Sequence, residues 1–472
     1  MLDVSPEDIT DGPLLRSLAV LSAPLLAQNL VLVAQEVIDL FWLGRLSGEA
    51  VAATGFAFPV MALLFALAVF APFVGTQVLV SQRVGGENLP GARRAVFTGF
   101  AVAVGGGLVV GVPAYLGAEP LLEAIAFAQP QAVTETVIRL GAAYLGVIAL
   151  GLPVLAATDA AEAAFVGWGD SRASLWMNLI AVGSNLVLDP ILIFGWGPAP
   201  ALGVYGAALA TVSGSAFGLL FAGALLVRGR NDGMVSHAAA RIDSGEIREL
   251  LEVGLPTAGQ QVASQSVRIV VVAVVFAAGG AAGLAAYIVG ARVATIAFVP
   301  ASGLQQATQS VVGQNLGAGK PRRSDRATWL GVALAVGALS AVGVVQWFVP
   351  GEIATLLVPE LSGEAFSLSI TYLEILAYGY PALGAVYLFQ GGFNGARRTT
   401  VSFYASIAQY WVVRLPIALT GAFALGFGVR AVFWAVTLSN IAAALGLGLY
   451  YRYSTHRGML ERATEAAASP AG

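Results

Sequence analysis

The sequence predicts an all-α integral membrane protein in which twelve transmembrane helices form two pseudo-symmetric six-helix lobes, a parallel repeat. Three observations lead to this fold class. Of the 472 residues, 57% are hydrophobic and only 11% are charged. Apolar runs long enough to cross a bilayer recur along the chain, and the second half repeats the first. A soluble protein has about a quarter of its residues charged, so a soluble enzyme is excluded.

The residue types that the chain lacks narrow its chemistry further. It has no Cys, so disulfides, thiolate metal sites and Cys nucleophiles are excluded. Its two His residues, His237 and His456, lie outside the apolar runs, so we expect no haem, zinc site or His general base within the membrane. We expect no cofactor and no nucleic-acid partner, and we expect a monomer in contact with membrane lipid.

A helix that crosses about 30 Å of hydrocarbon needs about 20 residues. Twelve runs of that length or longer lie between polar breaks, and they cover residues 14–43, 50–80, 95–117, 133–165, 174–197, 203–228, 247–278, 284–311, 326–349, 366–395, 400–425 and 428–452. Their internal Gly and Pro suit close-packed, interrupted transmembrane helices, and they lack the alternation of barrel strands.

The basic residues predict the orientation of these spans, because Lys and Arg of short loops favour the cytoplasmic side. One side carries 18 of the 24 Lys and Arg residues, and the other carries only Arg45, Arg139 and Arg430. We therefore expect a multi-pass protein of the plasma membrane with both termini in the cytoplasm. The lobes are expected at 1–228 and 247–452. A cytoplasmic linker is expected at 229–246, and a cytoplasmic tail at 453–472, of which the last stretch, ERATEAAASPAG, is typical of disorder.

An internal repeat runs through the chain at a shift of about 232 residues. Pro24 pairs with Pro256, and the loop QRVGGENLPGARRA (82–95) pairs with QNLGAGKPRRSDRA (314–327). Six is an even number, so both halves begin on the same side and are related by a pseudo-two-fold axis along the membrane normal. Such a pair can enclose a cavity that opens to either side in turn. This favours transport over a bundle that duplication merely enlarged.

Carboxylates inside a membrane cost about 2.5–3.5 kcal/mol each and indicate functional sites. The candidates are Glu36, Asp39, Asp159, Glu162, Asp189 and Glu374. At the positions that match the five first-lobe acids, the second lobe has Arg268, Val271, Tyr387, Gln390 and Ile417. The scaffold therefore does not need these acids, and they indicate a site in the first lobe.

Asp39 and Asp189 are the pair that we expect to form this site. Asp39 lies near the outer end of the first helix, and Asp189 follows Asn185 by four residues on one face of the fifth. Both should lie at similar depth and close a small polar chamber. Apolar surroundings and a second carboxylate both disfavour the charged form, so the pair suits H⁺ binding. The same oxygens, with the Asn185 carbonyl and a hydroxyl, also suit Na⁺. A solvated helix end or a buried ion pair remains the alternative for each Asp.

Other polar residues of the first lobe are candidates for substrate contact or proton relay, namely Gln35, Glu36, Tyr144 and Asp159. Glu36 can instead pair with an Arg such as Arg139, and Tyr144 more often packs than binds. Glu162 is expected to be solvated, because it is near the cytoplasmic end of its helix.

Two further features concern the helices themselves. Pro24 removes a backbone hydrogen bond, so it can act as a hinge whose bend changes when Asp39 is protonated. Pro256 is the same residue without the acid, and if Pro24 is only a fold feature, both helices should bend alike. In the second lobe, Arg292 and Arg414 are intramembrane bases, and we expect a structural pair with Glu374.

Several stretches resemble the multidrug and toxic compound extrusion (MATE) family. The loop and fifth helix of that family are similar to FVGWGDSRASLWMNLIAVGSNLVLDPILIFG (165–195). Its second-lobe signature loop is similar to SVVGQNLGAGKPRRSDRA (310–327), and its tenth and eleventh helices to FQGGFNGARRTT and WVVRLPIAL (389–400, 411–419). The resemblance extends from about residue 14 to 452.

This resemblance implies a multidrug or organic cation efflux antiporter, which exports amphiphilic compounds as H⁺ or Na⁺ flows inward. It also points to Asp39, Asn185, Asp189 and Thr211 as the ion-coupling site. Because helices 7 and 10 lack acids at the positions used by other branches, the DinF-like branch is favoured. A lipid-linked oligosaccharide flippase of the same superfamily is the alternative, although flippases tend to have a basic cavity. An intramembrane enzyme is a second alternative, for which the chain offers only carboxylates.

Overall fold

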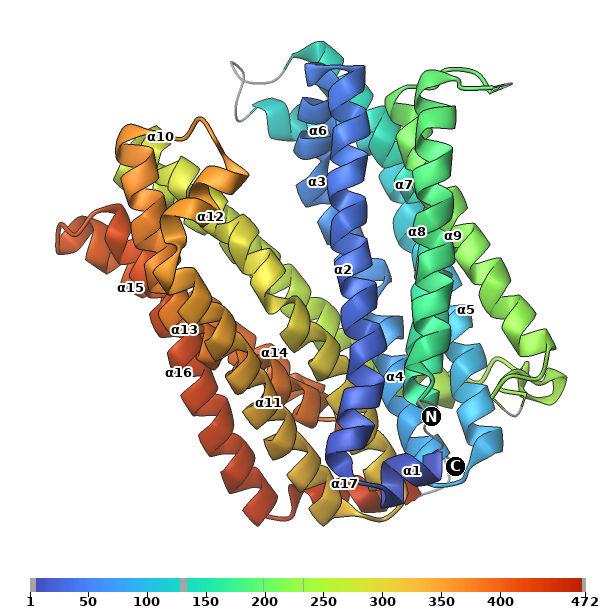
Figure 1. Cartoon of the computed structure of the whole chain (residues 1–472). Helices are drawn as coiled ribbons and strands as arrows, with labels where there is room; N and C mark the ends of the chain where they lie inside the picture. Colours follow the sequence, from blue (N-terminus) through green and yellow to red (C-terminus); the bar gives the residue numbers. More distant parts are fainter. Residues whose placement is uncertain (1–5, 128–133, 198, 232, 469–472) are drawn as a thin grey trace. The chain divides into compact units, whose positions relative to one another are not determined.

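The computed structural model describes residues 6–127, 134–197, 199–231 and 233–468. Residue 133 of the fourth expected span, residue 232 of the expected linker and residues 469–472 of the expected tail lie outside this description. The chain divides into two units, and the helices are labelled along it in Figure 1. The first unit is built on Ala27–Gln261, and the second is built on Asp8–Leu26 and Val262–Ser469.

In the described residues, seven α-helices lie wholly within the first unit and include the second to sixth expected spans. They are α3 (Gly48–Ala68), α4 (Phe70–Gly85), α5 (Leu89–Leu116), the short α6 (Ala118–Phe127), α7 (Glu135–Trp168), α8 (Ser171–Phe194) and α9 (Val204–Val227), followed by the 3-10 turn η1 (His237–Ala239). The long α7 packs against α3, α4, α5 and α9, and α8 packs against α9. The expected second span is divided, because α3 ends at Ala68 and α4 begins at Phe70.

The second unit repeats this order with one difference in helix type. It contains α1 (Pro6–Asp11) from Asp8 onward, α11 (Pro321–Phe348), α12 (Pro350–Leu357), α13 (Gly363–Gly395), α14 (Thr399–Ile407), η2 (Ala408–Arg414), α15 (Leu415–Leu419), η3 (Thr420–Ala424), α16 (Val429–His456) and α17 (Met459–Ala468). The elements η2 and η3 are π-helical, so the expected eleventh span has wide turns at two places. Such turns are frequent at functional sites.

Two long helices contribute to both units. α2 (Leu14–Leu46) belongs to the second unit up to Leu26 and to the first from Ala27. α10 (Ser244–Gly317) belongs to the first unit up to Gln261 and to the second from Val262. The two units therefore differ from the lobes 1–228 and 247–452 at the beginnings of these helices, which pack with the opposite half of the chain.

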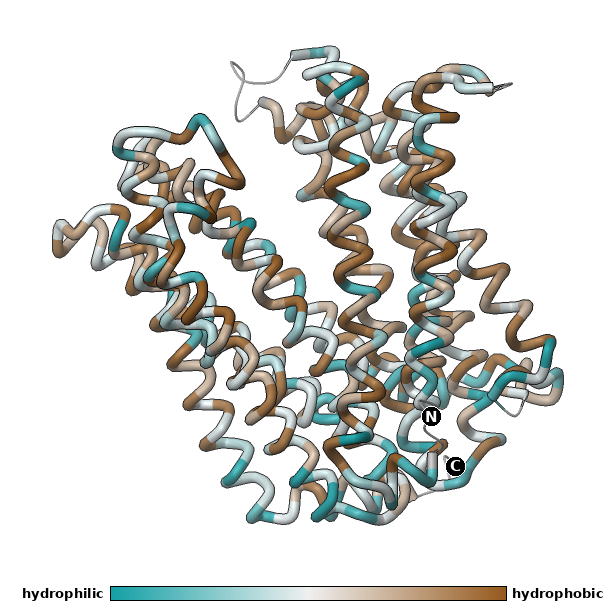
Figure 2. The backbone as a smooth tube through the Cα atoms, viewed as in Figure 1, coloured by the Kyte–Doolittle hydropathy of each residue, from teal (hydrophilic) through white to brown (hydrophobic). Residues whose placement is uncertain are grey.

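The membrane spans agree with the sequence prediction. Within the described residues, ten helices are long and apolar enough to cross a membrane. α10 counts once among them, although Gly280, at φ 57° and ψ −153°, divides it into two helices. α13 is outside that set and has 33 residues. With α10 taken as two helices and α13 included, the described chain has the twelve expected spans, and Figure 2 shows the hydrophobic residues along them.

The C-terminal tail is more ordered than expected. Residues 459–468 form α17, in which Met459, Leu460 and Ala463 are buried. The expectation of disorder is therefore wrong up to Ala468. Its physical reason is that an amphipathic helix of ten residues packs against α11 and α16.

The repeat is visible in the backbone. In the loop after α4, the amide of Asn88 donates to the carbonyl of Arg83 at 2.8 Å. In the loop after α10, 232 residues later, the amide of Lys320 donates to the carbonyl of Asn315, also at 2.8 Å. The two halves thus share not only residues but also the same turn geometry at the same place.

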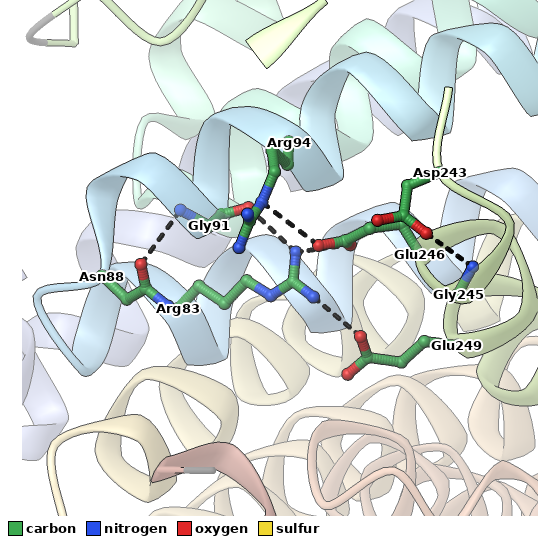
Figure 3. Close-up of polar contacts among 8 residues, drawn as sticks. All are labelled: Arg83, Asn88, Gly91, Arg94, Asp243, Gly245, Glu246 and Glu249. Carbon is green, nitrogen blue, oxygen red and sulfur yellow. Dashed lines mark hydrogen bonds and ion pairs between the residues drawn. The ribbon is translucent and has the colours of Figure 1, made fainter. Parts of the chain in front are cut away.

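A buried ion-pair cluster holds the first turns of α10 in the first unit (Figure 3). The Arg83 guanidinium lies 2.7 Å from Glu246 and 2.7 Å from Glu249, and the Arg83 and Glu246 side chains are only 6% and 4% exposed. Arg83 also donates to the Gly91 carbonyl at 2.9 Å, and Arg94 approaches Glu246 at 3.4 Å. The cluster joins α4 and α5 to α10.

The matching loop of the second unit holds the segment that precedes α2. Asn315 and Arg323 donate to the Ile9 carbonyl at 3.4 and 3.1 Å, and Lys320 Nζ contacts Asp11 Oδ1 at 2.6 Å. In each unit, the loop between the second and third helices therefore anchors the start of a helix that continues in the other unit.

We expect Glu246→Gln to lower the free energy of unfolding by about 3 kcal/mol, because it leaves a buried guanidinium charge with one partner fewer. The matched control is Glu252→Gln on the same helix. It removes a pair with Arg248 whose side chains are 80% and 62% exposed, and it should cost less than about 1 kcal/mol. Thermal melting of the purified protein in detergent measures both. Equal losses in the two variants would contradict the assigned role of the cluster.

Candidate functional site

Three helices of the first unit bring polar side chains together. Asn185 and Asp189 lie on one face of α8, and each is only 1% exposed. Asp39, on α2, is partly exposed, and its carboxyl group lies within hydrogen-bonding reach of that of Asp189. The structure thus places the two aspartates side by side, as the sequence predicted. Their role in ion coupling remains a prediction.

The Asn185 amide stands between both aspartates. In one orientation its oxygen accepts from Gln35 Nε2 at 2.8 Å, and its nitrogen donates to Asp189 Oδ1 at 3.4 Å. When the amide is turned over, its nitrogen donates to Asp39 Oδ1 at 3.1 Å, and its oxygen accepts from the backbone N–H of Thr211 at 3.2 Å. The Asn185 amide is therefore close enough to both aspartates to donate a hydrogen bond to either of them.

The close approach of α9 to α8 positions this amide. Three glycines of α9, Gly206, Gly214 and Gly218, face the backbone of α8. A Cβ atom at Gly214 would lie 2.5 Å from the Ala181 carbonyl oxygen and 3.0 Å from Asn185 Cβ. The absence of a side chain at this position is what allows the two helices to meet beside Asn185.

The remaining first-lobe candidates surround the pair in different ways. Tyr144 packs with the cluster around Leu43, and its hydroxyl lies within electrostatic reach of both aspartates. The Thr211 hydroxyl donates to the Ala207 carbonyl at 3.1 Å, so its oxygen is free to accept. Glu36 is exposed, and in the described chain no ion pair joins it to an Arg.

A second polar cluster lies on α2, α7 and α8. Glu162 is 5% exposed and accepts from Asn178 Nδ2 at 3.0 Å, and Ser174 Oγ donates to Gln28 Oε1 at 2.7 Å. The expectation that Glu162 is solvated is wrong, because α8 covers it. Asp159 is half-buried and within electrostatic reach of Glu162.

Sequence reasoning missed the partners in this second cluster. The spacing of Asn178 and Asn185 was the available signal, because residues seven apart share one face of a helix. Both side chains are buried, at 7% and 1% exposure. One face of α8 thus carries amides and a carboxylate along much of its length.

The bases of the second unit do not behave as predicted. Arg414 donates to Ser439 Oγ and to Asn440 Oδ1, both at 2.9 Å, and makes no ion pair with Glu374 among the described residues. The reason is that Arg414 lies in the π-helical η2, which packs against α16. Arg292 is exposed and likewise has no ion pair in the described part of the chain.

The proposed hinge and the proposed Na⁺ ligands remain predictions. Pro24 lies inside α2, two residues before the point at which the helix passes from one unit to the other. The described residues contain no group of three or more His, Cys, Asp and Glu side chains that could hold a metal ion. The Na⁺ ligands predicted from the sequence are instead two carboxylates and an amide, Asp39, Asp189 and Asn185.

The chain matches the MatE family model over residues 24–191 and 256–420. A probable multidrug resistance protein NorM of Deinococcus radiodurans is 29% identical over 450 residues, 94% of this chain and 96% of that protein. A FAD transporter of Shewanella oneidensis is 26% identical over 448 residues, 94% and 95% of the two chains. A solved outward-facing structure of a multidrug resistance MATE family transporter of the MOP superfamily has a TM-score of 0.87 at 22% identity, and covers 99% of this chain and 100% of that one.

We expect Gly214→Ala to lower the free energy of unfolding by about 1–3 kcal/mol, because the added methyl group must displace α8. The matched control is Gly223→Ala on the same helix, where a Cβ atom meets nothing within 4 Å. It should be neutral or stabilise the helix by up to about 1 kcal/mol. Thermal melts in detergent compare the two, and indistinguishable melting would show that α8 and α9 do not meet as described.

Proposed function

This chain belongs to the MatE family of membrane transporters, and is therefore not an enzyme, and we propose that it exports amphiphilic organic cations by alternating access. Relatives named for multidrug resistance, which align over more than nine-tenths of the chain, support this class of substrate. The observation that carries the proposal is the contact between the Asp39 and Asp189 carboxyl groups, because it offers a site for a coupling ion in one half only.

The proposed coupling ion binds where a carboxylate oxygen lacks a partner. Asp189 Oδ2 is buried and accepts no hydrogen bond within the described chain. A buried acceptor without a partner is costly, and an ionised one more so. A proton shared by the two carboxyl groups, or a Na⁺ ion held by both of them and the Asn185 oxygen, would remove that cost.

The Asn185 amide links the proposed ion site to α2. Its two polar atoms lie within hydrogen-bonding distance of Gln35 on α2 and of both aspartates. Ion binding at the aspartates would change the charge that this amide faces, and with it the polar contacts between α8 and α2.

Such a change at Asp39 would also affect the part of α2 that lies away from the ion site. Asp39 lies on the part of α2 that belongs to the first unit, whereas Pro24 lies on the part that belongs to the second. A bend at Pro24 would therefore change the angle between these two parts of α2. The membrane potential can drive export against a substrate gradient. One charge that crosses 100 mV supplies about 2.3 kcal/mol, which corresponds to roughly a 50-fold gradient of the substrate.

The finer assignments of orientation, association state and branch follow the sequence. The excess of basic residues on one side supports cytoplasmic termini in the plasma membrane, and we propose a monomer. Val271 and Ile417 stand where Asp39 and Asp189 have their counterparts, which supports coupling in the first lobe and a place in the DinF-like branch.

We predict that Asp39→Asn and Asp189→Asn each reduce ion-driven flux of a fluorescent lipophilic cation in proteoliposomes at least ten-fold, because an amide cannot take up a proton and does not supply the negative charge that balances Na⁺. The control is Glu49→Gln, which neutralises an exposed acid in the first turn of α3 and should leave flux unchanged. All variants are first compared by size-exclusion chromatography. Unchanged flux in both aspartate variants would refute the coupling site.

The coupling ion is identified by imposing each gradient alone. We expect either an inward pH gradient without Na⁺, or an inward Na⁺ gradient at equal pH, to drive substrate movement, because both ions fit the same oxygens. Asp189→Asn should abolish the effective one. Flux that needs neither gradient, or that persists at full rate in Asp189→Asn, is inconsistent with antiport at this site.

A further inference from the structure

The second unit carries its own charged cluster, which the proposed coupling site does not use. Arg268, in α10, stands at the position that matches Glu36 in the repeat, so the charge is inverted between the halves. Arg268 is exposed and has no hydrogen bond or ion pair with any described residue. A base within a membrane span with no partner is a functional-site hypothesis by default.

Arg414 is the second base of this cluster, and all of its partners are neutral. It is half-buried and donates through Nε to Ser439 Oγ and through Nη2 to Asn440 Oδ1. Its guanidinium carbon lies 4.7 Å from the centre of the Tyr410 ring. These contacts fix the plane of the guanidinium, but no carboxylate neutralises it within the described chain, and Nη1 has no hydrogen-bond partner there.

A pair of tyrosines lies in the hydrophobic cluster to which Val267, next to Arg268, belongs and against which Leu415, next to Arg414, packs. Tyr287 and Tyr372 stack with their ring centres 5.6 Å apart, and both rings are buried, at 7% and 2% exposure. Each hydroxyl lies within electrostatic reach of both Arg268 and Arg414. Neither hydroxyl makes a hydrogen bond to the rest of the described chain. Two fixed positive charges and two uncommitted O–H donors therefore share one region of the second unit.

The arrangement suits one class of ligand. An oxyanion accepts hydrogen bonds from guanidinium and hydroxyl donors and neutralises the two charges. A planar ring attached to it would find the half-buried ring of Tyr410 for contact. The wide turns of η2, which carry both Arg414 and Tyr410, place these two groups on the same wall of the site.

We propose that Arg268 and Arg414, with Tyr287 and Tyr372, bind the carboxylate or phosphate group of an aromatic substrate in the second unit. The site is separate from the aspartate pair of the first unit, and it extends the substrates of the proposed exporter from cations to compounds that carry an oxyanion. Only the transport of such a ligand rests on the proposed function, because its binding can be measured without any gradient.

The test compares two probes that share a ring and differ in charge, riboflavin 5′-phosphate and riboflavin. Binding to the full-length protein in detergent is followed by the fluorescence of the ring. The wild type should bind the phosphate at least ten-fold more tightly than riboflavin. Arg268→Gln and Arg414→Gln should each weaken the phosphate at least ten-fold and leave riboflavin unchanged. Equal affinity of the wild type for both probes overturns the proposal.

Two further variants separate recognition from folding and from general charge. Arg414→Lys keeps the charge but loses the planar fork, and it should bind the phosphate with an affinity between those of Arg414→Gln and the wild type. Arg292→Gln removes another exposed base of the same unit, one that does not act on either tyrosine, and it should bind like the wild type. A loss in Arg292→Gln as large as that in Arg414→Gln would mean that only net charge matters, and would overturn the site.

The outcome is independent of the cation flux measured above. If the wild type fails to move the cation but binds the phosphate in an Arg414-dependent manner, the proposed function fails and this site stands. If the wild type moves the cation but binds both probes equally, the site fails and the proposed function stands.

Discussion

The contact between two carboxyl groups in apolar surroundings is the constraint around which the first unit is arranged. Two ionised carboxylates that lie next to each other repel one another, and the burial of Asp189 removes the water that would otherwise screen this repulsion. Much of the nearby structure serves this contact. The glycines of α9 let α8 approach, Asn185 offers its amide to one acid or the other, and α2 carries the second acid toward α8.

The two halves show how one scaffold supports opposite chemistry. Their loops share hydrogen bonds that are 232 residues apart, so the backbone has kept its geometry since the halves diverged. The acids within the membrane spans of the first half have not been kept in the second. Where the first half has five acids, the second has Arg268, Val271, Tyr387, Gln390 and Ile417. Duplication therefore supplied the frame, and each half then acquired its own polarity.

Much of the fold and part of the site could be predicted from the sequence. Intramembrane acids stand out against apolar runs. The second half lacks acids at the positions that match Asp39 and Asp189, which shows that the scaffold does not require them, so the two could be paired as a site. Glu162 was misjudged, because hydropathy locates a helix end but does not say which neighbour covers it. The partner of Arg414 was missed, because π-helical turns break the 3.6-residue periodicity on which face assignments depend. The exchange of α2 and α10 between the units was missed, because a linker marks where the chain continues and not where it packs.

That exchange has a consequence for the origin of the molecule. Leu250, near the start of α10, is fully buried among first-half residues, and Leu18, near the start of α2, is fully buried as well, in the second unit. Neither half can complete its own interior, because each lends its opening turns to the other. A six-helix ancestor built in this way would have needed a second copy of itself to complete its interior. Fusion of the two genes would have turned this exchange of helix ends between two chains into an exchange within one chain.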